Sequence, residues 1–320
     1  MQTSSRALRH IALSALIGML FYGLFILIAD RAEIEQAVTQ LDISIWSVIL
    51  GLSLANYVLR FVRWHGYLRL LGYQIPLTLD CTNYFAGFAF TVTPGKAGEA
   101  VRSLYLEKQG VRYNDSLAMF VAERVLDLCV ITTLLALVAA QFVDGWSLVA
   151  AGVTILLFAF IAVRMARSKT FASVCSLSGA SPWVATLRRR LRSIIRQSSQ
   201  LLRSRSLCIG LGLGFVAWAL EGVAVYLIAT ELGIEISLVA AVGIYAASVL
   251  AGAFSMIPGG VGSTEATMTL LLVLFGADLP TAVAVAVICR IATLWFAVAI
   301  GSMAVCALQL DTSHVADGAN

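Results

Sequence analysis

Charged residues are scarce in this chain, and their scarcity decides its class. Asp, Glu, Lys and Arg together make up 12% of the 320 residues, and hydrophobic residues make up 60%. A soluble domain has about a quarter of its residues charged. Residues 11–29, 146–163 and 236–257 carry no charge, and each is close to the roughly 20 residues that a spanning helix needs. We therefore expect an integral membrane protein.

The chain also lacks the residue patterns of enzymes and metalloproteins. Its six cysteines are scattered without a Cys-x-x-Cys pair, which is typical of small apolar residues in or near helices. Its three histidines lie far apart and form no ligand set. No nucleophile motif is present, and the longest polar stretch, residues 164–206, is too short for a soluble catalytic domain. An intramembrane enzyme is supported only by the acidic pair Glu123 and Asp127. We expect no enzyme, no metal, no cofactor and no nucleic-acid partner.

Two similar breaks interrupt the hydrophobic sequence. Residues 93–99 read TPGKAGE and residues 257–265 read IPGGVGSTE, so each break contains Pro-Gly, a further glycine and a glutamate. Glu99 precedes Arg124 by 25 positions, and Glu265 precedes Arg290 by 25. Backbone groups cannot stay unpaired in lipid, so such breaks persist only inside protein or beside a watery cavity. Paired breaks in two halves of a membrane protein indicate the central site of a transporter.

The distribution of Lys and Arg predicts the topology, because short cytoplasmic loops collect basic residues. It predicts six spans at about residues 11–29, 43–60, 115–143, 146–163, 207–230 and 280–310, with both termini in the cytoplasm and the protein in the cytoplasmic (inner) membrane. The first break has basic flanks and should re-enter from the cytoplasm. The second has acidic flanks and should re-enter from outside. Only Arg31 is then external, and only Arg124 and Arg290 lie within the membrane.

The predicted fold is an all-α polytopic membrane protein, with about six spanning helices and two re-entrant hairpins in an inverted repeat. Residues 1–320 form one domain. Residues 11–143 are the first repeat, and residues 146–310 are the second, including a basic connector at residues 164–206. In the connector, five apolar residues share a helical face: Leu187, Leu191, Ile194, Ile195 and Leu202. This predicts an interfacial helix attracted to anionic lipid; alternatively, its arginines only set the topology.

The hairpin tips are candidate anion sites. Thr93 can cap a helix begun by Pro94, and Ser263 or Thr264 can cap the helix after Gly262. The free N–H groups and the positive end of each helix dipole suit phosphate or carboxylate. Lys96 adds a full positive charge. The alternative is that both tips are tight packing turns.

Charged residues within the predicted spans are the second group of candidates. Glu123 and Asp127 share a helical face, and Arg124 can pair with Asp127. Arg290 lies roughly 15 Å into the last span. Such groups are costly in a membrane and indicate function, or else they neutralise one another to hold the repeats together. Four further residues are typical of an interfacial anchor: Arg60, Arg63, Trp64 and Tyr67.

Four motifs, in order along nearly the whole chain, resemble the lysylphosphatidylglycerol synthase transmembrane (flippase-like) domain family. The first is Pro-Gly-x-x-Gly-Glu-x-x-Arg, matched by Pro94, Gly95, Gly98, Glu99 and Arg102. Glu123, Arg124 and Asp127 match Glu-Arg-x-x-Asp. The third is Pro-Gly-Gly-x-Gly near a glutamate, matched by Pro258, Gly259, Gly260, Gly262 and Glu265; the fourth is an arginine in the last span, Arg290. The family pattern often has Arg-Glu after the last glycine, whereas Thr264 stands here, so a head-group contact from that arginine is not expected.

The resemblance implies a lipid translocase for an anionic or zwitterionic phospholipid or a polyprenyl-linked lipid of the cell envelope. We do not expect the soluble aminoacyl-transferase domain of the bifunctional synthases, or their synthase activity. The alternative is a non-transporting membrane partner of a lipid-modifying enzyme or glycosyltransferase. Candidate partners are the lipid substrate, an anionic lipid surface, a lipid-modifying enzyme and a second copy of the chain. The substrate-binding candidates are the residues of the four motifs with Lys96 and Ser263.

Overall fold

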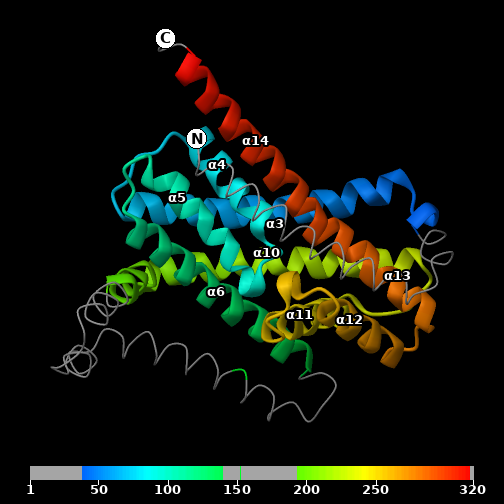
Figure 1. Ribbon diagram of the computed structural model, residues 1–320. Helices are drawn as coiled ribbons and strands as arrows, with labels where there is room; N and C mark the ends of the chain where they lie inside the picture. Colours follow the sequence, from blue (N-terminus) through cyan, green and yellow to red (C-terminus); the bar gives the residue numbers. More distant parts are fainter. Residues whose placement is uncertain (1–37, 140–151, 153–192, 318–320) are drawn as a thin grey trace.

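The structure, a computed structural model, describes residues 38–139, 152 and 193–317, and it is helical with no strand in these residues. The first half contains α3 (Ile43–Leu70), α4 (Leu77–Ala86), the 3-10 helices η1 (Gly87–Phe90) and η2 (Pro94–Val101), α5 (Arg102–Glu107) and α6 (Tyr113–Ala139). The second half contains α10 (Ser204–Glu231), α11 (Leu238–Phe254), the 3-10 turn η3 (Pro258–Gly260), α12 (Ser263–Leu274), α13 (Leu279–Arg290), the π-helical turn η4 (Ile291–Trp295) and α14 (Phe296–Asp317). Figure 1 shows their arrangement.

Three described helical stretches are long and apolar enough to cross a membrane: Ile43–Leu70, Arg205–Glu231 and Leu279–Leu310. They confirm an all-α membrane protein. The predicted spans at residues 11–29 and 146–163 lie outside the described residues, apart from residue 152, so the count of six spans stays a prediction. The helix of the second predicted span, at about residues 43–60, continues to Leu70.

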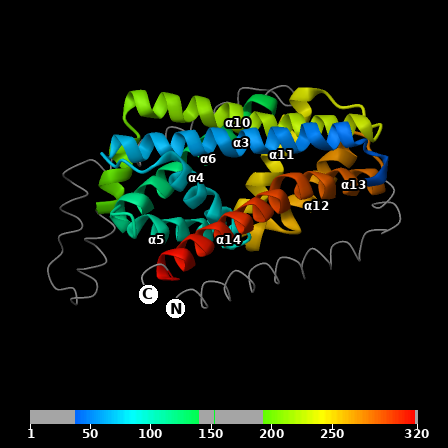
Figure 2. The same ribbon diagram turned by 90° about the horizontal axis from the view of Figure 1, so that it is seen from above.

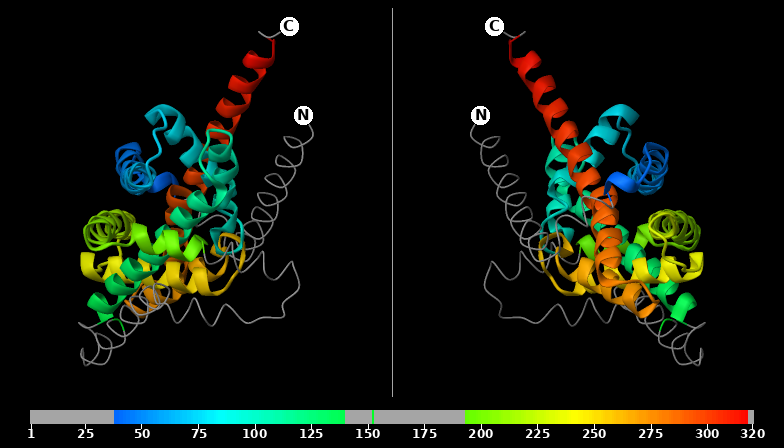
Figure 3. Two further views of the ribbon diagram at one scale, coloured as in Figure 1. Left: turned by 90° about the vertical axis from the view of Figure 1, so that its left-hand side faces the viewer. Right: turned by 90° about the vertical axis from the view of Figure 1, so that its right-hand side faces the viewer.

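The two halves place equivalent helices in equivalent contacts. α3 and α10 pack side by side and run in opposite directions (Figures 1 and 2), and Figure 3 shows them end on. The first hairpin (residues 77–107) lies toward one end of this pair and the second (residues 238–274) toward the other, and their tips η2 and η3 touch. α11 packs against α6, just as α4 and η1 pack against α14. In the predicted inverted repeat, the hairpin of each half contacts the last helix of the other half, as these hairpins do.

The two ends of the helix pair differ in charge. The end where α3 finishes carries Arg69, Lys108, Arg112, Arg203 and Arg205. The other end carries Asp42, Glu231, Glu235 and Asp278, and no Lys or Arg in the loops described there, residues 38–42, 232–237 and 275–278. The backbone N–H and hydroxyl of Thr281 donate to Asp278, the N-cap of α13, and lower the pKa of its carboxyl group. The predicted orientation places the basic end in the cytoplasm, and it stays a prediction.

The described part of the connector packs on protein. Residues 193–201 are helical; Ile194 and Leu202 are buried, and the Ser198 hydroxyl donates to the Ala118 carbonyl of α6 at 2.9 Å. Arg196 and Arg203 face outward. This differs from the predicted placement of the apolar face on the membrane surface, because α6 covers that face here. Leu187 and Leu191 lie outside the described residues.

The first hairpin packs on α14 where Gly301 has no side chain. A Cβ added there would overlap the backbone nitrogen of Ala89 and lie 2.6 Å from the carbonyl carbon of Phe88. Backbone atoms cannot move aside as a flexible side chain can. α14 and η1 can therefore approach this closely only with glycine at this position.

Gly301→Ala should therefore destabilise the protein by about 1–3 kcal/mol, the usual cost of overpacking. Thermal unfolding in detergent measures the change. Gly51→Ala is the matched control, because a Cβ at Gly51 of α3 meets no atom within 4 Å. Equal melting temperatures for Gly301→Ala and Gly51→Ala would contradict the tight contact.

Candidate functional site

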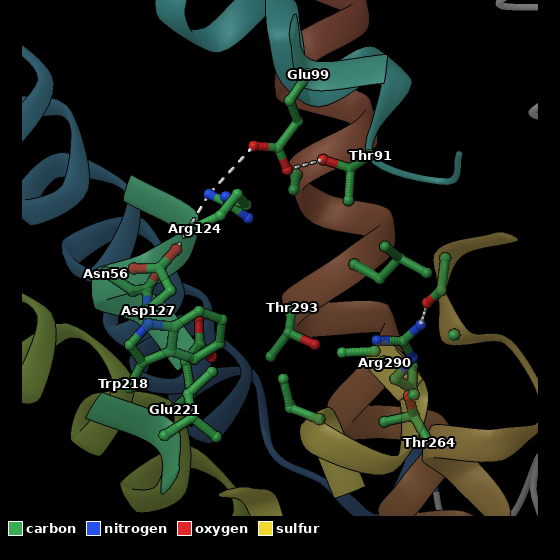
Figure 4. A pocket seen from close by; sticks show the side chains of 18 of the residues that line it. Asn56, Thr91, Glu99, Arg124, Asp127, Trp218, Glu221, Thr264, Arg290 and Thr293 are labelled. Atoms are coloured by element: carbon green, nitrogen blue, oxygen red, sulfur yellow. Dashed lines mark hydrogen bonds and ion pairs between the residues drawn. The ribbon is translucent and has the colours of Figure 1, made fainter. Parts of the chain in front are cut away.

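A cavity of about 390 Å³ lies between the two hairpin tips. Its volume falls within the roughly 300–1,000 Å³ typical of small-molecule sites. In Figure 4, Glu99, Arg124 and Asp127 lie on one side, and Arg290 and Thr264 on the other. The polar lining comes from both halves of the chain: Asn56, Tyr57, Arg60, Thr91, Thr93, Glu99, Arg124, Asp127, Glu221, Tyr245, Thr264, Arg290 and Thr293.

Arginines and carboxylates are interleaved beside the first hairpin. Arg124 Nη2 lies 3.1 Å from Asp127 Oδ2 and 3.5 Å from Glu99 Oε2. The Thr91 hydroxyl donates to Glu99 Oε1 at 2.9 Å. Arg63 Nη2 donates to Asp127 Oδ1 at 2.7 Å. These contacts confirm the predicted pairing of Arg124 with Asp127, and they show Glu99 as a second partner.

The second hairpin has the equivalent pair. Arg290 Nε donates to Glu265 Oε1 at 2.8 Å, and its Nη2 donates to the Gly259 carbonyl at 2.5 Å. Glu265 Oε2 accepts from the backbone N–H of Gly262 at 2.8 Å. Arg290 thus ties the tip of the second hairpin to the last helix. The spacing of 25 residues brings glutamate and arginine together in both halves.

The caps at the tips differ from the prediction. α12 begins at Ser263 with Gly262 as its N-cap, at φ +87°, and Glu265 accepts the Gly262 N–H. Ser263 and Thr264 therefore do not cap it, and the protein's own carboxylate occupies the positive end of this helix.

At the first tip, Thr93 holds the predicted N-cap position and its hydroxyl accepts from Gly98 N at 2.6 Å. The segment after it is a 3-10 helix, not an α-helix.

The cavity reaches the outer surface of the helix bundle through apolar residues. Leu128, Phe254 and Met256 line it and are nevertheless 44%, 78% and 63% exposed. Met256 also has φ +54°, the only positive φ at a non-glycine residue in the described part of the chain. Backbone strain of this kind concentrates at functional sites. The site therefore has a charged interior and an apolar, outward-facing mouth.

Comparison with known proteins places this site in a family. Residues 11–301 match the family described as "Lysylphosphatidylglycerol synthase TM region". The chain belongs to this family. Two UPF0104 membrane proteins of Methanothermobacter thermautotrophicus are 25% and 27% identical, covering 92% and 85% of this chain and 94% and 86% of their own. UPF0104 membrane protein PH1989 of Pyrococcus horikoshii is 24% identical over 76% of this chain and 81% of its own.

In this member of the synthase TM-region family, some predicted site residues line the cavity: Glu99, Arg124, Asp127, Gly259, Gly260 and Arg290. The others whose side chains the structure describes do not line it: Gly98, Arg102, Glu123, Pro258, Gly262, Ser263 and Glu265. Pro94, Gly95 and Lys96 belong to a stretch whose side chains lie outside the described part, so the role predicted for Lys96 stays a prediction.

Arg102 and Glu123 are the clearest case of a support behind the cavity. Arg102 Nη2 contacts Glu123 Oε2, and both residues are fully buried. The Arg102 guanidinium lies 3.7 Å from the centroid of the Trp64 ring and 4.8 Å from that of Tyr84. This pair joins α5 to α6. Its position gives no support to the predicted contact with substrate.

The interpretation of Arg60, Arg63, Trp64 and Tyr67 as an interfacial anchor is wrong, because all four are buried. More arginines thus lie inside the protein than the predicted Arg124 and Arg290. A signal was available in the sequence. Ser53, Asn56, Arg60 and Arg63 are spaced by three, four and three residues, which places them on one face of a helix.

A π-helical turn follows Arg290 directly and was not predicted. It spans Ile291–Trp295, and the Tyr57 hydroxyl donates to the Thr293 carbonyl at 2.6 Å. A π turn interrupts the regular helical hydrogen bonds and is frequent at functional sites. Here it gives α3 an anchor on the last helix beside the cavity.

Proposed function

We propose that this protein translocates a membrane lipid, with the lipid head group passing through the cavity between the two hairpin tips. The observation that carries the proposal is the combination of a charged interior with an apolar, exposed mouth. Charged groups inside a membrane are costly and are kept where they serve a pathway. The head group is anionic or zwitterionic, on a phospholipid or a polyprenyl-linked lipid, and the acyl or prenyl chains stay outside the mouth.

The arrangement of the hairpins supports this route. The hairpins lie toward opposite ends of the α3–α10 pair and their tips meet. If that pair crosses the membrane, one hairpin lies toward each membrane surface. A head group from either surface then reaches the tips along one of the two hairpins. The membrane family of the chain and its membrane-protein relatives agree with this role.

Arg124 is suited to exchange partners during passage. Its side chain is 20% exposed, and it is shared between Asp127 and Glu99. A phosphate can take the place of one carboxylate while the other keeps the guanidinium paired. Arg290 and Glu265 are the counterpart in the second half, and we expect them to serve the opposite state of the cycle.

Reconstitution with labelled lipids tests the proposal. We expect Arg124→Gln to slow lipid movement about 10- to 100-fold, since a hydrogen bond to a charged group contributes about 1.5–3 kcal/mol. Arg112→Gln is the matched control, because Arg112 is exposed at the basic end of the molecule and pairs only with its neighbour Asp115 among its described ion-pair partners. It should move lipid at the wild-type rate.

Two results would count against translocation. One is that no candidate lipid crosses faster than in empty vesicles. The other is equal rates for Arg124→Gln and Arg112→Gln. In the first case the non-transporting partner of a lipid-modifying enzyme becomes the function to test, by co-purification with such enzymes.

A further inference from the structure

We infer that Arg60, on α3, binds the phosphodiester of an anionic lipid beside Arg124. The inference rests on the proposed function for the lipid itself and on geometry for the site. Arg60 lines the cavity and is only 4% exposed. Its Nε and Nη2 atoms have no hydrogen-bond partner in the part of the chain that the structure describes. Its nearest carboxylate oxygens, Asp127 Oδ2 and Glu99 Oε2, lie 3.7 and 3.8 Å from Nη2, beyond hydrogen-bond length.

The arginines around Arg60 have closer carboxylate partners than Arg60 has. The ion pairs beside the first hairpin join four arginines (Arg60, Arg63, Arg102 and Arg124) to three carboxylates (Glu99, Glu123 and Asp127). Arg63 and Arg102 each have a close carboxylate partner. Arg60 and Arg124 are the two arginines of this cluster that line the cavity. Arg124 lies 3.1 Å from Asp127, whereas both carboxylate contacts of Arg60 are longer than a hydrogen bond. Glu221 also lines the cavity and accepts from Ser53.

A buried guanidinium with unused donors indicates what the cavity accepts. Buried N–H groups without an acceptor are costly. A phosphodiester supplies negatively charged oxygens that can accept from them. Its two free oxygens match the paired N–H donors of a guanidinium, the geometry that favours arginine over lysine at phosphate sites.

Two aromatic rings hold the Arg60 guanidinium without using its donors. Its Cζ lies 5.6 Å from the centroid of the Trp218 ring and 5.7 Å from that of Phe88. Cation–π contacts stabilise the positive charge through the ring faces. These contacts leave the N–H groups unused, and we expect the phosphodiester to accept from them. Trp218 and Phe88 act as positioning residues for Arg60.

Lipid binding in neutral detergent tests the site without requiring transport. We would measure affinity and the rise in melting temperature with phosphatidylglycerol and, as an uncharged comparison, diacylglycerol. Two further samples use glycerophosphoglycerol, the soluble head group, and inorganic phosphate. We expect phosphatidylglycerol to bind and stabilise the wild type, and the other three compounds to bind at least tenfold more weakly.

Three variants define the contribution of Arg60. Arg60→Gln should fold, because Asp127 and Glu99 keep Arg63 and Arg124 as partners, and should bind phosphatidylglycerol at least tenfold more weakly. Arg60→Lys keeps the charge but loses the paired donors and should bind with intermediate affinity. Arg69→Gln is the control on the same helix, since Arg69 is exposed, and should bind like the wild type.

Several results would overturn the inference. Wild-type affinity in folded Arg60→Gln would do so. If Arg60→Gln does not fold, wild-type affinity in Arg60→Lys has the same meaning. Binding of inorganic phosphate or glycerophosphoglycerol as tight as that of the lipid would assign the site to a soluble anion. Binding that depends on Arg60 without any lipid crossing would uphold the site and reject translocation. Normal lipid crossing by Arg60→Gln would reject the site and uphold translocation.

Discussion

Glu265→Ala is expected to lower the free energy of unfolding by about 3–5 kcal/mol, the usual result of removing one partner from a buried ion pair. Glu265 is fully buried and holds two groups at once, Arg290 Nε and the Gly262 N–H. Its loss leaves the guanidinium without its carboxylate and α12 without its cap. Thermal and denaturant unfolding in detergent would measure the change.

A double variant separates the ion pair from the cap. Glu265→Ala with Arg290→Leu removes both charges and should recover a large part of the lost stability, because no guanidinium is then left buried without a carboxylate. Glu231→Ala is the matched control at an exposed position and should change stability little. A Glu265→Ala protein as stable as Glu231→Ala would show that the pair does not hold the second hairpin.

The glutamate–arginine pairs were predictable from the sequence because their cause is local and repeated. In each half a glutamate just past a Pro-Gly break is followed by an arginine 25 residues later. A charged residue in an apolar helix needs a partner of opposite charge. Each half of the chain has that partner at the same spacing. The structure places both pairs together, at 3.5 Å for Arg124 with Glu99 and 2.8 Å for Arg290 with Glu265.

The roles of Arg60 and Arg63 depended on contacts that the sequence does not specify. Two arginines near the end of a hydrophobic run are typical of an interfacial anchor. They are buried here because α3 continues to Leu70 and packs along α10, where Asn56 Nδ2 donates to the Ala217 carbonyl at 2.8 Å. The spacing of Ser53, Asn56, Arg60 and Arg63 shows that they share one face of α3. Whether that face contacts protein or water depends on the helix that packs against it.

The caps and the π turn show the limit of local rules. Ser263 and Thr264 are good cap residues by type, but Glu265 caps α12 from inside the helix while pairing with Arg290. Which residue caps α12 therefore depends on Arg290, 25 residues further along the chain. The π turn likewise coincides with a tertiary contact, the hydrogen bond from Tyr57 to Thr293. Sequence patterns within one helix contain neither partner.

Joining the two hairpin tips covalently is expected to stop lipid movement entirely. η2 and η3 are in contact, and Val92 and Val261 lie in one buried cluster with Val287 and Leu294. If a head group passes between the tips, they must separate in each cycle. Val92→Cys with Val261→Cys, oxidised to a disulfide, prevents that separation. The six native cysteines would first be replaced, and mass spectrometry would confirm the bond.

The reduced form of the same protein is the control for this experiment. Lipid movement in liposomes should be lost on oxidation and return on reduction, while either single cysteine variant should be insensitive to both treatments. Reversibility matters because a packing defect from the two substitutions would persist after reduction. Full transport by the disulfide-linked protein would mean that the tips stay together and that lipid follows another path. The hairpins would then be structural supports, and the unpartnered donors of Arg60 would need a different explanation.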